Sequence, residues 1–191
     1  MNQLEMLESV LTKDSALLSS VRPEQGTNAT DCPDFDVAAL SQHMAGWIGL
    51  FESAANGEEF KGDPQAPQDD PAEHFRASSE RLVEGWRSGG FDREVPMMGG
   101  KQPASGVVAM TLIEFVTHGC DLALATEQGV PFTDEELETT LEGAKASIAE
   151  DYRGEGKFFG PEISVPEDAS ALDRLLGFMG RQPASPLGSL E

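Results

Sequence analysis

The longest apolar segment of the chain, residues 103 to 126, constrains the fold more than any other part of the sequence. Its apolar residues fall on most sides of a helix rather than along one stripe, which is typical of a helix at the centre of a bundle. The same segment carries Glu114, His118 and Asp121. The helix around which the chain folds must therefore accommodate two carboxylates and an imidazole.

Weaker helical patterns surround this segment, and turn or capping residues bound each of them. Asp34 or Asp36 caps one helix, Asp70 followed by proline begins another, and the stretch TDEE from residue 133 is a capping box. A short extended piece is expected between residues 89 and 103, and no alternating strand pattern is present. The predicted helices cover residues 4–20, 36–56, 71–88, 103–126, 134–152 and 168–179, so the sequence predicts an all-α fold.

Composition excludes several kinds of partner. The chain of 191 residues carries 34 acidic and 13 basic residues, a net charge of −21. Such a field repels nucleic acids and anionic membranes. No run of 18 or more apolar residues is present, and the N-terminus lacks the basic start and apolar core of a signal peptide. With two cysteines, Cys32 and Cys120, the chain fits a reducing cytoplasm. We expect one domain over residues 1–183 and a tail over 184–191.

Glu114 and His118 are spaced so that their side chains converge. Residues four apart on a helix differ by about 40° in direction and about 6 Å along the axis. A buried glutamate without a partner costs several kcal/mol, and no lysine or arginine lies between Lys101 and Lys145. A divalent cation resolves this conflict if His43, in the middle of another apolar helix, supplies a third ligand. Two histidines and one carboxylate are typical of catalytic zinc, and also suit nickel, iron or manganese.

Simpler explanations of the same residues stay open. A histidine in an apolar helix is often a core residue bonded to a carbonyl, and a Glu–His pair at this spacing is often only an ion pair. Asp121 either orients His118, accepts a proton in catalysis, or makes a capping or surface contact. Cys120 points about 200° away from His118 around the helix and is expected to pack in the core. Cys32 precedes a helix, where a structural role in the turn is expected.

Three segments resemble proteins related to mycothiol-dependent maleylpyruvate isomerase. CPDFDVAALSQHMAGW is similar to the segment C-P-x-W-x-V-x-x-L-x-x-H of that family, and IEFVTHGCDLALAT is similar to E-x-x-x-H-G-W-D-L-A-x-A-T. LDRLLGFMGRQP resembles the C-terminal signature L-x-x-F-x-G-R-x-P. The matches occur in the same order and span residues 32 to 183. The chain departs from the family pattern at Phe35 and Cys120, where the family carries tryptophan.

The resemblance implies a DinB/YfiT-like four-helix bundle with up-down-down-up connectivity, here with additional short helices. It also implies a divalent metal held by His43, Glu114 and His118. These are the same three residues that were considered above as candidate ligands. The isomerase carries an additional C-terminal domain that contributes to its activity, and the resemblance covers the bundle. We therefore expect the chemistry of the bundle rather than maleylpyruvate isomerisation itself.

Two functions follow as hypotheses. The first is a thiol-dependent transferase or isomerase, in which a mycothiol-type thiol attacks a small electrophile and Asp121 assists. A metal-bound site suits this chemistry because a cation lowers the pKa of a thiol and the thiolate is the nucleophile. The second is a non-catalytic metal-binding or sensor bundle. Zinc is the first expectation for the metal, the expected partners are a small thiol and its electrophile, and the protein is expected to be a monomer or homodimer.

Overall fold

A computed structural model describes residues 1–154, 157 and 159–184. The chain divides into two compact units, Met1–Pro131 and Phe132–Glu191. All of the candidate site residues lie in the first unit. The predicted single domain over residues 1–183 stays a prediction, and residues 185–191 of the predicted tail lie outside the described residues.

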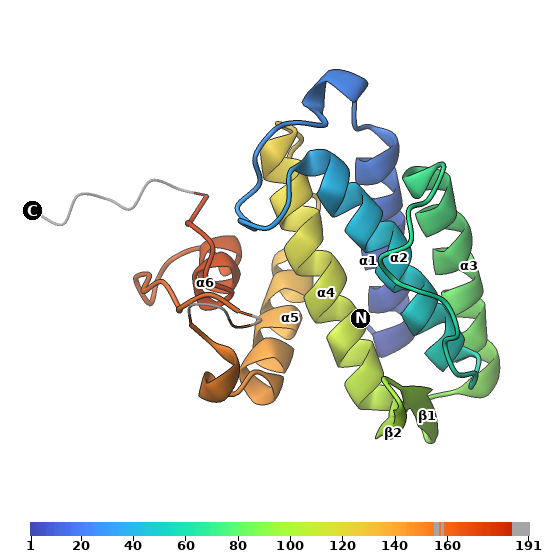
Figure 1. The fold of residues 1–191 in the computed structure, drawn as a ribbon. Coiled ribbons are helices and arrows are strands. Elements are labelled where there is room, and N and C mark those ends of the chain that lie inside the picture. The colour runs from blue at the N-terminus through green and yellow to red at the C-terminus, as the bar shows by residue number, and fades with distance from the viewer. Residues whose placement is uncertain (155–156, 158, 185–191) are drawn as a thin grey trace, which may run out of the picture. The chain divides into compact units, whose positions relative to one another are not determined.

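Four long helices build the first unit: α1 (Gln3–Ser19), α2 (Val37–Ala55), α3 (Pro71–Gly89) and α4 (Ala104–Ala125). Following the chain in Figure 1, α1 and α4 run in one direction and α2 and α3 in the opposite one. The helix α2 packs against α3 and α4, and α1 packs against the same two helices. This arrangement is an up-down-down-up bundle, and the predicted mostly helical architecture is confirmed.

The first turns of these helices follow from capping chemistry. The Asp36 side chain accepts a hydrogen bond from the Ala39 backbone N–H at 2.8 Å, which fixes the start of α2. Asp70 caps α3 in the same way, with proline in the first turn. Of the two caps considered for α2, the structure uses Asp36 rather than Asp34. A short 3-10 helix, η1 (Pro23–Gln25), lies between α1 and α2.

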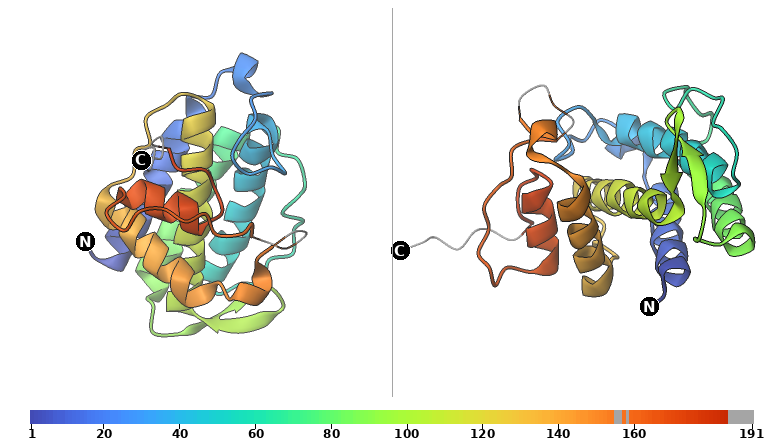
Figure 2. Two further views of the ribbon diagram at one scale, coloured as in Figure 1. Left: turned by 90° about the vertical axis from the view of Figure 1, so that its left-hand side faces the viewer. Right: turned by 90° about the horizontal axis from the view of Figure 1, so that it is seen from below.

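A small hairpin precedes α4, where the sequence predicted a short extended piece. Strand β1 (Glu94–Met97) pairs antiparallel with β2 (Gly100–Pro103). Met98 and Gly99 connect them with φ values of 50° and 77°, and two positive φ values are the signature of a tight hairpin turn. Figure 2 shows the hairpin at the end of the bundle where α4 begins.

The helix α4 is the core of the first unit. Within the part of the chain that the structure describes, it alone is long and apolar enough to cross a membrane by length and composition, yet 78% of its most apolar window is buried. Burial on most sides is the property of a core helix. The Phe115 ring lies 5.6 Å from Phe51 of α2 and 5.1 Å from Phe75 of α3, edge to face in both pairs. These contacts fix the rotation of α4 about its axis.

In the second unit, helices α5 (Asp134–Ser147) and α6 (Ala171–Phe178) pack against each other. The predicted continuation of α5 to Tyr152 is wrong: Ile148 is extended, and a 3-10 helix η2 (Glu150–Tyr152) follows. Two acidic residues at that point oppose the negative end of the helix dipole. The helix α6 begins later than predicted because the Ser170 hydroxyl accepts from the Asp173 backbone N–H. Thr133 and Glu136 form the predicted capping box.

The loop between α2 and α3 is fastened to α2 beside His43. The Gln42 side chain donates to the Gln68 carbonyl at 2.9 Å and accepts from the Gln68 N–H at 2.7 Å. One turn further along α2, Gly46 leaves room for the Pro64 carbonyl, which a Cβ atom at this position would overlap. The absence of a side chain at residue 46 is therefore required by the close approach of the loop.

We expect Gly46→Ala to lower the free energy of unfolding by about 1–3 kcal/mol, because the added methyl group forces the backbone of the loop away. Gly106→Ala is the matched control, since Gly106 is also helical and a Cβ atom there meets nothing within 4 Å. The control should be neutral or stabilising by up to about 1 kcal/mol. Urea unfolding of the two variants measures both values, and equal stabilities would contradict this account of Gly46.

Candidate metal centre

The structure brings His43, Glu114 and His118 together between α2 and α4. Glu114 Oε1 lies 2.7 Å from His43 Nε2 and 3.7 Å from His118 Nε2. The two imidazole rings are 4.9 Å apart, edge to face. One carboxylate oxygen therefore faces the Nε2 atoms of both histidines, and potential ligand atoms of the three residues all lie within 4.8 Å of one another.

Helix geometry explains this convergence. Glu114 and His118 are one turn apart on α4, so their side chains leave the helix on the same face. The neighbouring residue Phe115 points into the aromatic contacts with α2 and α3, which turns the Glu114 face towards His43. His43 lies two turns into α2, at a position set by the Asp36 cap. Core packing and a helix cap thus place ligands that come from distant parts of the sequence.

Asp121 lies behind His118 rather than among the three. Its carboxylate oxygen Oδ2 is 3.1 Å from His118 Nδ1, and its side chain is fully buried. A histidine whose one ring nitrogen faces a ligand site and whose other nitrogen faces a carboxylate is held in a fixed orientation and tautomer. The geometry therefore favours the orienting role over a capping or surface contact.

The segment before α2 is bonded to the C-terminal end of α4, the end nearer to His118 and Asp121. Gln25 and Asn28 donate side-chain hydrogen bonds to the carbonyls of Thr126 and Ala125, at 2.7 and 2.8 Å, where the helix leaves carbonyl groups unbonded. Further along this segment, the Thr30 hydroxyl donates to the Phe35 carbonyl at 2.7 Å and accepts from the Cys32 N–H at 3.2 Å. These bonds fix a turn whose side chains reach the candidate centre.

Two aromatic rings line the candidate centre on the α2 side. The Phe35 ring lies 4.7 Å from the ring of His43 and 6.1 Å from that of His118. Trp47, one turn after His43, lies 5.7 Å from its ring. This contact makes Trp47 a wall of the candidate centre. Phe35 had been noted only as a departure from the family pattern.

The three residues suit a divalent ion. Zinc bonds of about 2.0–2.2 Å at tetrahedral angles put donor atoms about 3.3–3.6 Å apart. The 3.7 Å between Glu114 and His118 is close to this separation, whereas the 2.7 Å between Glu114 and His43 is a hydrogen bond that must lengthen to admit an ion. The exposed fractions of the side chains are 18% for His43, 22% for Glu114 and 10% for His118. Each of the three side chains is thus mostly buried but keeps a solvent-exposed part. The donor types fit zinc, nickel, iron or manganese.

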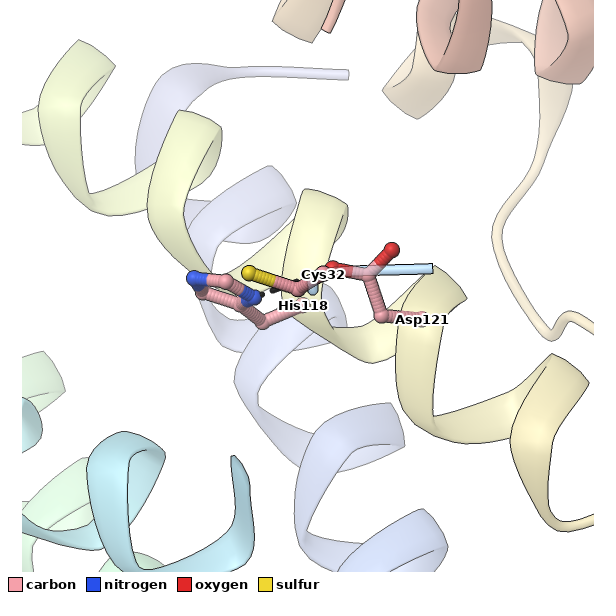
Figure 3. Close-up of side chains that lie close together, drawn as sticks. All are labelled: Cys32, His118 and Asp121. Atoms are coloured by element: carbon pink, nitrogen blue, oxygen red, sulfur yellow. Dashed lines mark hydrogen bonds and ion pairs between the residues drawn. The ribbon is translucent and has the colours of Figure 1, made fainter. Parts of the chain in front are cut away.

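Cys32 is the residue near the centre that sequence reasoning placed only in a turn. Its Sγ lies within 4.8 Å of ligand atoms of His118 and Asp121. Figure 3 shows these three side chains close together. No periodic pattern signals this position, because it depends on how an irregular segment crosses the end of α4. Cys120 is fully buried, as predicted.

The fold and the cluster define a class: a four-helix bundle with a candidate metal site of histidine and carboxylate residues between two of its helices. Residues 10–123 match the family described as mycothiol maleylpyruvate isomerase N-terminal domain. The match covers more than half of the chain and includes His43, Glu114 and His118, and the protein belongs to this family.

Comparison with solved structures supports the fold. The chain is similar to the crystal structure of a histidine-to-alanine mutant of the mycothiol-dependent maleylpyruvate isomerase, with a TM-score of 0.55 and 19% identity over 96% of this chain and 80% of the other. The predicted DinB/YfiT-like fold is confirmed. Among curated proteins, the uncharacterized proteins MT0763 and Rv0738 of Mycobacterium tuberculosis, strains CDC 1551 / Oshkosh and ATCC 25618 / H37Rv, are each 27% identical over 87% of this chain and 91% of their own length.

We expect protein purified without chelators to carry about one divalent ion per chain, since three donors converge on one point. His118→Ala should remove the ion because it deletes one of three ligands. His74→Ala is the matched control, since His74 lies on α3 outside the cluster. Elemental analysis measures the three proteins, and equal metal contents would place the ion elsewhere.

Asp121→Asn should weaken metal binding by about tenfold to a hundredfold, the usual effect of removing the carboxylate that orients a histidine ligand. The substitution keeps the size of the buried side chain, so circular dichroism should show an unchanged helix content. Asp92→Asn makes the same change at an exposed position before β1 and should leave affinity unchanged. Isothermal titration with zinc gives the affinities. Unaltered binding by Asp121→Asn would assign that carboxylate to packing alone.

Proposed function

We propose that the protein is a metal-dependent thiol transferase or isomerase, in which a mycothiol-type thiol attacks a small electrophile. The observation that carries this proposal is the partly exposed cluster of His43, Glu114 and His118 in a chain of the mycothiol maleylpyruvate isomerase N-terminal domain family. The structural relative is a mycothiol-dependent isomerase, which supports this class of thiol as the cosubstrate.

His43, Glu114 and His118 would hold a divalent ion, which would supply the Lewis-acid chemistry that lowers the pKa of a thiol. The protein's own contribution is the placement of the donors. His43 and His118 present imidazole nitrogens, and Glu114 brings a carboxylate that would partly balance the charge of a divalent ion. Zinc is the first expectation, with nickel, iron and manganese as alternatives.

Asp121 acts on His118 rather than on the substrate. Because its side chain is fully buried, it holds the proton of His118 at Nδ1 and leaves Nε2 free to face Glu114. Phe35 and Trp47 exclude water from one side of the cluster and offer an apolar surface to the substrate. The reacting groups therefore meet between an apolar wall and the three metal-ligand candidates.

A non-catalytic metal-binding or sensor bundle is the second candidate. The observation that favours it is the small exposed fraction of the three side chains, 10 to 22%, which also suits an ion held for structure. For either function, the net charge of −21 argues against nucleic-acid and membrane partners. A cytoplasmic location and a monomeric or homodimeric state remain part of the proposal.

Purified protein at full metal occupancy should conjugate mycothiol to a model electrophile such as a halogenated aromatic compound or a maleimide-like alkene. Removal of the metal with a chelator, or Glu114→Gln, should reduce the rate to that of the uncatalysed reaction, because the donor set is then incomplete. His74→Ala should keep the full rate. The assay follows loss of free thiol and appearance of the conjugate. Absence of turnover with mycothiol, bacillithiol and glutathione at full occupancy would support the non-catalytic bundle.

A further inference from the structure

We propose that Cys32, His118 and Asp121 form a second metal-ligand set, which takes a soft, thiophilic cation and excludes an ion from the first set. The two sets share His118. This inference concerns metal binding alone, so it holds or fails independently of the proposed transferase activity.

The geometry of the second set is that of a ligand cluster. The Cys32 sulfur, a ring nitrogen of His118 and a carboxylate oxygen of Asp121 lie within 4.8 Å of one another. Zinc bonds are about 2.3 Å to sulfur and 2.0–2.2 Å to nitrogen and oxygen, so small side-chain movements bring all three onto one ion. Figure 3 shows the Cys32 sulfur beside the His118 ring. The dashed line in the figure marks the contact between His118 and Asp121. Two chain segments supply the three groups: Cys32 comes from the turn before α2, and His118 and Asp121 come from α4.

Opposite nitrogens of the His118 ring face the carboxylates of the two sets. In the first set, His118 Nε2 faces Glu114 Oε1 at 3.7 Å, and in the second, His118 Nδ1 faces Asp121 Oδ2 at 3.1 Å. A neutral imidazole has one N–H and one lone pair. An ion on Nε2 leaves the proton on Nδ1, where Asp121 accepts it. An ion on Nδ1 moves the proton to Nε2, on the side of Glu114. Occupancy of one set therefore removes the lone pair that the other set needs.

Ligand chemistry separates the ions that each set prefers. The second set contains a thiolate, which favours soft or borderline cations, whereas the first set has only nitrogen and oxygen donors. Binding at the second set releases the thiol proton to solvent, as metal binding to cysteine generally does. Cys32 is half-buried, so an ion can reach its sulfur. The other cysteine, Cys120, is fully buried and is absent from both clusters, which makes it a natural control.

Cadmium is a suitable probe because its bond to a thiolate produces a charge-transfer absorption in the ultraviolet. Titration of the reduced, metal-free protein should produce this absorption and saturate at about one cadmium ion per chain, as expected when the neutral imidazole of His118 offers one lone pair. Cys32→Ser should lose the absorption, and Cys120→Ser should keep it. His43→Ala removes a ligand of the first set alone and should also keep it, whereas Asp121→Asn should need a higher cadmium concentration to reach the same signal.

Four results would overturn the proposal. Persistence of the absorption in Cys32→Ser, or its absence in the unaltered protein, would show that Cys32 does not bind the ion. Its loss in His43→Ala would make the sulfur a further ligand of the first set rather than part of a separate one. Saturation at two ions per chain would disprove mutual exclusion. Circular dichroism of each variant checks the fold, and Asp121→Asn provides an independent test if Cys32→Ser does not fold.

Discussion

The rotation of α4 about its own axis is the constraint on which the rest of the first unit depends. Phe115 packs edge to face against Phe51 and Phe75, and the next residue on a helix points about 100° away. Glu114 is therefore turned towards α2 and contacts His43, and His118 follows one turn later on the same face. A contact among apolar rings thus determines where the polar groups meet, so the core and the candidate centre have one cause.

The same constraint makes a carboxylate tolerable on a core helix. Glu114 is only 22% exposed, and its oxygen lies within 4 Å of two imidazoles. A partly buried carboxylate is costly unless positive charge or hydrogen bonding compensates it. Asp121 is fully buried, and its carboxylate is compensated by the contact with Nδ1 of the His118 ring. In a chain of net charge −21, a divalent ion at this candidate centre would add the compensation that the histidines supply incompletely.

The periodic parts of this structure could be predicted from the sequence, and the irregular parts could not. Helical spacing relates Glu114 to His118 directly, and the capping residues Asp36 and Asp70 mark where two helices begin. The approach of His43 depends on the packing of two helices, which spacing suggests but does not determine. The position of Cys32 depends on side-chain bonds from the η1 region to the end of α4, and such long-range bonds leave no local pattern. The end of α5 was missed because helix propensity outweighed the unfavourable charges at that end.

This division between helices and turn bears on how members of the family can differ. The helices supply His43, Glu114 and His118, and any change in their rotation disturbs the core, so the donor set is tied to the fold. The turn before α2 supplies Phe35 and Cys32, which approach the donors without being part of the core helices. Of the two departures from the family pattern, Phe35 alters a wall of the centre, whereas Cys120 is buried in the core. The turn can therefore change the surroundings of the candidate centre while His43, Glu114 and His118 stay in place.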